Sequence, residues 1–211
     1  MSRLCCLFLV FIAVPCGGQR IGFGVKGGVR PTNDIVGSAT SESKRYVAGP
    51  MLDVSLPLGL GIEIDALYSR FGYRTATGGF WGSFSSVRRA NVWEFPILAK
   101  YRLPFPLIKP YVSGGYALRR VTGSYNSEGY TVDLSTGNRQ WYTQHGSWEP
   151  EAGGGAVIGG GVELGGRHFR IAPEVRYTRW SNDIINAYGS QGYRVNSALN
   201  QTQILLGLSW R

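Results

Sequence analysis

The sequence predicts an all-β fold, an eight-stranded antiparallel up-and-down transmembrane β-barrel, and three observations predict it. Eight segments alternate apolar and polar residues with a period of two, which is the pattern of a strand whose two faces meet different surroundings. None of the eight apolar faces contains a charged residue. The connections between the segments are alternately long and short, as in a chain that winds up and down through a bilayer.

The composition of the chain agrees with this fold class and excludes several others. The 211 residues include 31 Gly, 12 Tyr, 9 Phe and 6 Trp, and only 17% are charged. A helical bundle would be rich in Ala, Leu, Glu and Lys, and a disordered chain would contain few aromatic residues. No run of 18 apolar residues occurs, so no transmembrane helix is expected. The basic residues behind the formal charge of +9 are dispersed, so nucleic acid is not expected as a partner.

Residues 1–18 are expected to form a cleaved signal peptide, which leaves residues 19–211 as the outer-membrane β-barrel domain. A short basic start with Arg3 precedes an apolar run over residues 4–14, and small or turn-forming residues follow it. Cleavage is expected after Gly18, with the bond after Cys16 as the second choice. All 3 cysteines of the chain lie in this segment, so the exported domain is expected to have no disulfide, no thiolate nucleophile and no cysteine-bound metal. An exported membrane barrel predicts the bacterial outer membrane as its location.

The first four segments each place apolar side chains on one face and small or polar side chains on the other. Such a segment is a strand with lipid on one side and a polar interior on the other. The segments cover residues 21–30, 46–56, 60–71 and 92–103. Their apolar faces consist, in order, of Ile21, Phe23, Val25 and Val29; Ala48, Pro50, Leu52, Val54 and Leu56; Leu60, Ile62, Ile64, Ala66 and Tyr68; and Trp93, Phe95, Ile97, Ala99, Tyr101 and Leu103.

The last four segments repeat this pattern over residues 110–121, 156–164, 169–180 and 201–211. Within the eight segments, Pro50, Pro96 and Pro173 each lack an amide donor, so we expect local bulges at these points. The apolar faces of the last four segments consist, in order, of Val112, Gly114, Tyr116 and Leu118; Ile158, Val162 and Leu164; Phe169, Ile171, Pro173, Val175 and Tyr177; and Thr202, Ile204, Leu206, Leu208 and Trp210.

The connections indicate which end of the barrel faces outward. Short turns are expected near residues 57–59, 104–109 and 165–168, and long loops over residues 31–45, 72–91, 122–155 and 181–200. In outer-membrane barrels the short turns are periplasmic and the long loops extracellular. A soluble up-and-down barrel would carry many Lys and Glu on its polar faces, which these faces do not. Aromatic residues that could form interfacial girdles lie near the strand ends, at Tyr68, Trp93, Tyr116 and Tyr177 on the loop side and at Phe23, Tyr101, Phe169 and Trp210 on the other.

Charged residues on the inward faces form the candidate site. The acids Asp53, Glu63, Asp65, Glu94, Glu163 and Glu174 match in number the bases Lys26, Lys100, Arg102, Arg119, Arg170 and Arg176. Because isolated charges in a narrow lumen are costly, these groups are expected to pair. Either the pairs form a structural plug, or the same network rearranges to open a pore. The candidate lumen charge network comprises Glu63, Asp65, Glu94, Lys100, Arg102, Arg119, Glu163, Glu174 and Arg176, and Lys100 is expected to pair with Glu63 or Asp65.

Motifs that suggest other chemistry have simpler explanations. The run GFGVKG, residues 22–27, fits the dinucleotide pattern G-x-G-x-x-G, but that motif must follow a strand and open a helix, whereas here it is itself a predicted strand. His145 lies near Ser147 and Glu149 in a predicted loop, but this proximity in sequence defines no catalytic geometry. The chain has only 2 His, the second being His168 in a predicted turn. No catalytic residue, cofactor site or metal site is therefore expected.

Three runs resemble the bacterial outer-membrane β-barrel domain family, which includes small OmpX-like and OmpA membrane-domain-like barrels. They are WEFPILAKYRLPFPLIKPYVSGGYALR at residues 93–119, GGGVELGG with FRIAPEVRYTRW within residues 159–180, and the closing QILLGLSWR. The resemblance covers most of the mature chain, and its motifs specify a fold rather than an activity. Barrels of this kind usually end in an aromatic residue that the assembly machinery reads, whereas here Trp210 is penultimate, before Arg211.

The expected function is that of a non-enzymatic outer-membrane barrel with a structural or surface-interaction role and a largely plugged lumen. The alternative is a narrow, porin-like channel for small solutes. Outer-membrane lipids and the outer-membrane assembly machinery are the expected partners. An extracellular ligand could bind at the long loops, where runs such as FWGSFSS and RQWYTQHGSW combine exposed aromatic residues with adaptable polar ones.

Overall fold

The computed structural model describes residues 20–32, 35–37, 39–80, 82–105, 108–148, 152–166, 168–183, 186–188 and 194–210. The expected signal peptide, residues 1–18, lies outside the described residues. The described chain is built almost entirely of strands, with one short 3-10 helix, η2, at Pro57–Gly59. No helix within the described ranges has the length and hydropathy to cross a bilayer.

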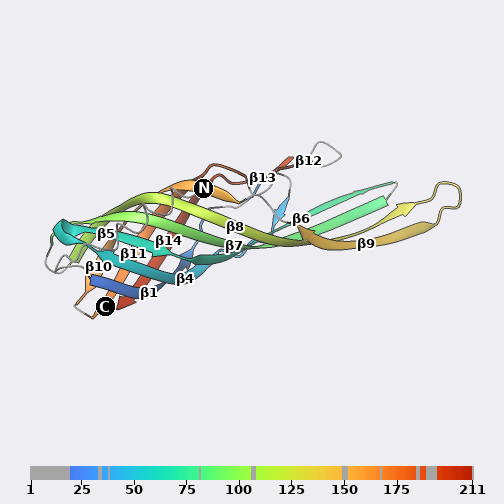
Figure 1. Ribbon diagram of the computed structural model, residues 1–211. Helices are drawn as coiled ribbons and strands as arrows, with labels where there is room; N and C mark the ends of the chain where they lie inside the picture. The colour runs from blue at the N-terminus through green and yellow to red at the C-terminus, as the bar shows by residue number, and fades with distance from the viewer. Residues whose placement is uncertain are drawn as a thin grey trace, which may run out of the picture.

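Eight antiparallel strands close into a ring, as the sequence predicts (Figure 1). The first strand, β1, pairs with β4 on one side and with β14 on the other, so that Phe23 lies opposite both Leu52 and Trp210 and the ring is closed. The strands β5 and β6 are consecutive and together fill one position of the ring. In ring order the strands are β1 (Arg20–Val29), β4 (Tyr46–Ser55), β5 (Leu60–Asp65) with β6 (Leu67–Gly79), β7 (Gly82–Arg102), β8 (Ile108–Val132), β10 (Gly153–Gly165), β11 (Phe169–Trp180) and β14 (Asn200–Trp210).

The stagger of the strands determines how wide the barrel is. A path from each residue to its partner on the next strand, started at Arg20 and followed once around the ring, reaches Gln203 on β14. Gln203 lies opposite position 30 of β1 and its continuation, so the path returns to the first strand ten residues away from its start. Eight strands with this displacement tilt by roughly 40° from the barrel axis. A barrel of eight strands has an interior just wide enough for side chains to fill it.

The outer wall is apolar and the interior is largely polar, which is the reverse of a soluble protein. Val112 is 61% exposed and Ile158 63% exposed on the outer wall, whereas Lys26 is 2% exposed and Glu63 0% exposed inside. An apolar band of this extent on the outside is the surface that lipid covers. Inward and outward residues alternate along the strands as the sequence predicts.

The interior also contains an apolar layer that the sequence analysis did not predict. Leu67, Leu98 and Leu205 point inward and are at most 2% exposed. Leu98 packs with Val157 and Trp180, and Leu67 packs with Leu205. The layer arises where the inward positions of several strands are occupied by aliphatic residues instead of glycines or charges. It separates the polar lower lumen from the outer mouth of the barrel.

The prediction of local bulges at the three prolines is wrong. The pairing register is unchanged across Pro50, Pro96 and Pro173, and the ladders are interrupted instead. Pro50 and Pro96 lie on the two strands that flank the break between β5 and β6, where the Ala66 amide donates to the Pro50 carbonyl over 3.0 Å. The two positions without an amide donor therefore face the same point, between β5 and β6, from the two neighbouring strands. The break at that point accommodates both prolines without an extra residue.

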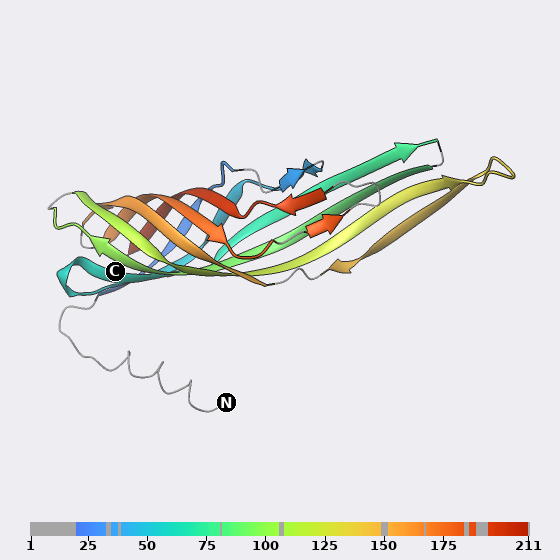
Figure 2. The same cartoon turned by 90° about the horizontal axis from the view of Figure 1, so that it is seen from above.

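Two of the four expected loops are largely strand. The strands β6, β7 and β8 run on beyond the barrel and, with β9 (Arg139–Trp148), form a four-stranded extended sheet at the end opposite the short turns (Figures 1 and 2). The 25 residues of β8 reach about 80 Å, more than twice the length that a strand needs to cross a bilayer. Both faces of the extended sheet are largely polar, so no apolar alternation marks these strands in the sequence. The short strand β3 (Thr40–Ser41) pairs with β6, and β2 (Ile35–Gly37), β12 (Asn186–Tyr188) and β13 (Arg194–Ser197) form a separate small sheet.

Candidate functional site

The lower lumen holds one continuous network of ion pairs. Five acids and five bases take part among the described residues, each at most 9% exposed. Their formal charges cancel, so the network itself carries no net charge. The members come from six of the eight strands and are Lys26, Asp53, Glu63, Asp65, Lys100, Arg102, Glu163, Arg170, Glu174 and Arg176.

The upper half of this network is centred on Glu63. Its carboxylate accepts from Lys26 over 2.5 Å and from the Arg176 guanidinium over 2.9 Å. Lys26 also donates to Glu174 over 2.9 Å, and Arg176 donates to Glu174 over 2.8 Å and to Asp65 over 2.9 Å. Three carboxylates thus share two bases from β1 and β11, and each base bridges strands on opposite sides of the lumen.

The lower half lies next to the short turns. Arg102 donates to Glu163 over 2.8 Å and also pairs with Asp53. Arg170 donates to the other oxygen of Glu163 over 2.7 Å and lies 3.4 Å from Asp53. Two arginines and two carboxylates therefore form a closed quartet, which suits the planar, two-pronged guanidinium group.

Lys100 joins the two halves. Its ammonium lies 2.5 Å from Glu63, 3.8 Å from Asp53 and 3.9 Å from Glu163. The expected pair between Lys100 and an acid of the neighbouring strand is therefore present, with Glu63 as the partner. The lysine also lies 4.2 Å from the centre of the Tyr111 ring, whose hydroxyl donates to Glu174 over 3.0 Å. Sequence reasoning missed Tyr111, because its inward position could be found only by continuing the alternation of β8 from Ser113.

Glu94 and Arg119, which were expected to belong to the network, lie apart from it. Along β7 the inward residues Leu98 and Pro96 separate Glu94 from Lys100. Glu94 accepts instead from the amide groups of Gln201 over 3.3 Å and Gln203 over 2.8 Å. The Arg119 guanidinium lies 4.2 Å from the centre of the Trp180 ring and donates to the carbonyl of Asn182 over 2.8 Å. The apolar layer is the physical reason, because it divides the charges of the lumen by depth.

A small pocket lies near Glu94 and Arg119 at the outer mouth. Its walls include Arg30, Phe71 and Gln201, and its interior has room for about one water molecule. A pocket of this size admits water but no larger solute. The charge network and the apolar layer lie deeper in the lumen than this pocket.

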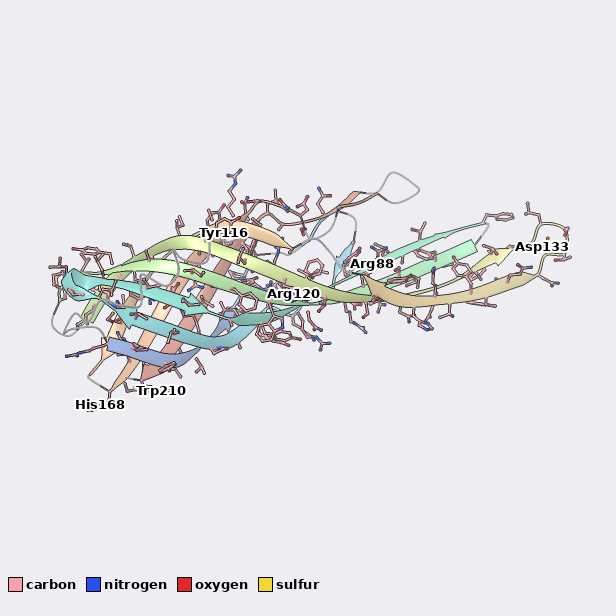
Figure 3. The ribbon with its side chains drawn as sticks, in the orientation of Figure 1. Arg88, Tyr116, Arg120, Asp133, His168 and Trp210 are labelled. Carbon is pink, nitrogen blue, oxygen red and sulfur yellow. The ribbon has the colours of Figure 1, made fainter. Side chains whose placement is uncertain are left out.

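The other motifs singled out in the sequence have structural roles or lie apart from one another. Residues 22–27 form part of β1, and a side chain at Gly24 or Gly28 would collide with the carbonyl of Leu208 or Ile204 on β14, so these glycines permit close strand approach. His145 is exposed on β9, and His168 lies in the turn at the opposite end of the barrel (Figure 3). Glu149 lies outside the described residues.

Aromatic side chains border the apolar wall at both ends. On the side of the extended sheet, the Tyr68 and Trp93 rings lie 5.3 Å apart, and the Tyr68 hydroxyl donates to Asn91 over 2.7 Å. On the side of the short turns, Phe23 and Phe169 both lie opposite the exposed Trp210. Rings with a polar tip at the edge of an apolar band are typical of membrane interfaces.

The extended sheet ends in a turn that is held by local hydrogen bonds. The Ser135 hydroxyl donates to Asp133 over 2.7 Å and the Ser135 amide donates over 2.9 Å. These bonds stabilise the carboxylate and lower the pKa of Asp133 from its ordinary value. In Figure 3, Asp133 marks the far tip of the sheet, well beyond the barrel.

Several solved structures are similar to this chain. Among solved structures the chain is similar to Neisserial surface protein A, at 13% identity over 92% of this chain and 98% of that one, with a TM-score of 0.45. It is also similar to the N-terminal β-barrel domain of Pseudomonas aeruginosa OprF, at 11% identity over 91% and 96% of the two chains, with a TM-score of 0.39. A third is Ail, the attachment invasion locus protein of Yersinia pestis, at 10% identity over 91% and 97%, with a TM-score of 0.34. No match was found among the curated proteins.

The sequence profile of one protein family matches residues 4–211, nearly the whole chain. This match confirms the resemblance that the strand motifs indicated. The chain therefore belongs to the outer membrane protein beta-barrel domain family.

Proposed function

We propose that the protein is a non-enzymatic outer-membrane barrel with a largely plugged lumen and a structural or surface-interaction role. The lumen network is the observation that supports a plugged lumen. It is neutral, buried and shared by six strands, so it ties opposite walls of the barrel together. Such an arrangement favours a single closed state over an open conduit.

Opening the lumen would break several ion pairs at once. Glu63 alone contacts Lys26, Lys100 and Arg176. Removing one partner of a buried pair costs about 3–5 kcal/mol, because the other charge is left uncompensated. The apolar layer adds a second barrier, since an ion that crosses it must lose hydrating groups without replacement.

The extended sheet supports the surface-interaction part of the proposal. Near its tip Trp141 is 72% exposed, and its ring lies 4.9 Å from that of Tyr130. The Arg139 guanidinium lies 4.8 Å from the centre of the Tyr130 ring. Rigid aromatic rings beside an arginine and small polar residues form a surface suited to recognition. We therefore place the contact with an extracellular ligand on this sheet.

Export and assembly complete the proposal. Family membership implies the bacterial outer membrane, and we propose that a signal peptide cleaved after Gly18 directs the chain there. The outer-membrane assembly machinery would act on the closing strand β14, whose exposed Trp210 is the aromatic residue nearest the end of that strand.

Single-channel recording in planar bilayers tests the plug against the alternative of a narrow channel. The purified full-length chain should show no conductance steps above the bilayer baseline, whereas an open porin measured in the same bilayers provides the positive control. Discrete openings of the wild-type protein would overturn the plug and support a channel for small solutes. Vesicle swelling in small sugars gives a second readout that does not depend on charge.

A further inference from the structure

Three arginines lie on the outward wall beside the aromatic residues at the root of the extended sheet. Arg70 follows Tyr68 by two positions on β6, and Arg120 is the strand partner of Trp93 on β8. Arg89 lies on β7 between them, four positions beyond Trp93. We call Arg70, Arg89 and Arg120 the arginine patch. Figure 3 shows Arg120 where the barrel passes into the extended sheet.

The patch is exposed and positively charged. Because the lumen network is neutral, the whole formal excess of +9 lies elsewhere in the chain. Within the described ranges, neither Arg70 nor Arg120 has a carboxylate partner. Arg89 lies 3.6 Å from Glu42, yet its side chain remains 64% exposed. The guanidinium groups are therefore available to an anion from outside the protein.

We infer that the arginine patch binds the phosphate groups of anionic lipids in the outer leaflet. The position of the patch selects this ligand, because aromatic girdles lie at the level of lipid headgroups and the patch faces outward beside Tyr68 and Trp93. A guanidinium group binds a phosphate through two parallel hydrogen bonds, which a lysine cannot do. A water-soluble ligand would instead meet the part of the sheet that projects further from the barrel.

The arrangement on three neighbouring strands suits a headgroup lying against the wall. Arg70 pairs in register with Asn91 on β7, and Asn91 pairs with Thr122 on β8, two positions beyond Arg120. Neighbouring strands lie about 4.8 Å apart, so Arg70 and Arg120 flank a strip of roughly 10 Å centred on β7. This strip carries Trp93, whose ring can cover the lipid below the phosphate. The inference is independent of the plugged lumen, since none of these side chains points inward.

Fluorescence quenching by brominated lipid provides the test. The folded chain carrying W210F, which removes the exposed tryptophan of the opposite girdle, is placed in phosphatidylcholine vesicles that contain a minor fraction of brominated phosphatidic acid. Quenching of its tryptophan fluorescence, with Trp93 next to the patch, reports the binding constant relative to phosphatidylcholine. Each arginine near an anionic surface strengthens binding about fivefold at low salt. We expect R70Q or R120Q to weaken the preference for phosphatidic acid about fivefold and the double variant roughly 30-fold.

Matched controls separate the patch from overall charge. The double variant R20Q and K109Q removes two exposed charges at the short-turn ends of β1 and β8, away from the patch, and should keep the preference of the wild type. R120K retains the charge but loses the two-pronged contact, so it should fall between the wild type and R120Q. Heat-resistant migration in gels verifies that each variant is folded.

Four results would overturn the inference. They are no preference of the wild type for phosphatidic acid, no loss in the R70Q and R120Q double variant, an equal loss in the R20Q and K109Q control, and displacement of the lipid by inorganic phosphate at matched concentration. The third result would assign the preference to net charge, and the fourth would assign the patch to free phosphate.

Discussion

Lys100 joins the two halves of the lumen network, so its replacement by methionine tests the plug directly. The lysine is 2% exposed and lies 2.5 Å from Glu63. Methionine fills a similar volume but leaves the network with one uncompensated negative charge. Glu63 retains Lys26 and Arg176, so the loss should fall near the lower end of the range for a broken buried pair, about 3 kcal/mol.

A double-mutant cycle with E63Q isolates the interaction between the two residues. The combined variant K100M and E63Q restores neutrality and should be more stable than the sum of the single losses predicts. S113A is the matched control, because Ser113 lies opposite Lys100 on β8 and its buried hydroxyl has no hydrogen-bond partner among the described residues. Its effect should stay within about 0.5 kcal/mol.

Reversible urea unfolding in phospholipid vesicles, followed by tryptophan fluorescence, measures these free energies. Additive losses from K100M and E63Q would refute the coupling and indicate a hydrated lumen in which the charges act independently. Conductance steps that appear only in the single variants would show that the pair closes a pore. A loss in S113A as large as that in K100M would indicate general sensitivity of the lumen rather than an effect of charge.

Three further predictions concern the wall, the strand contacts and export. L206R, near the middle of β14, should cost about 2–4 kcal/mol of unfolding free energy and I21R, at the end of β1, about 0–1 kcal/mol, because the penalty for arginine in lipid depends on depth; equal costs would argue against a bilayer around the wall. G24A should destabilise the barrel by about 1–3 kcal/mol, since its new methyl group would collide with the β14 backbone, whereas G27A, with its nearest neighbour 3.8 Å away, should be tolerated in the same unfolding assay. N-terminal sequencing of the protein extracted from membranes should begin at Gln19, and a retained Met1 would contradict export by a cleaved signal.

The sequence by itself determined the strand number, the faces and the closure of the barrel. An apolar residue at every second position can be recognised within a short stretch of sequence, because one face of each strand contacts lipid along its whole length. The same alternation assigned Glu63 and Lys100 to the interior and placed them on neighbouring strands. It could not reveal the outer parts of β6, β7 and β8, since a sheet that is largely polar on both faces has no such pattern.

Only the tertiary structure decided which charges meet. Lys26 and Glu174 are 148 positions apart in the chain and come together because the closed ring has a stagger of ten residues. The same stagger gathers aliphatic residues of several strands into one layer, which excludes Glu94 and Arg119 from the network. The depth of a side chain inside a barrel depends on the tilt and register of all the strands together, so no local sequence pattern predicts this depth.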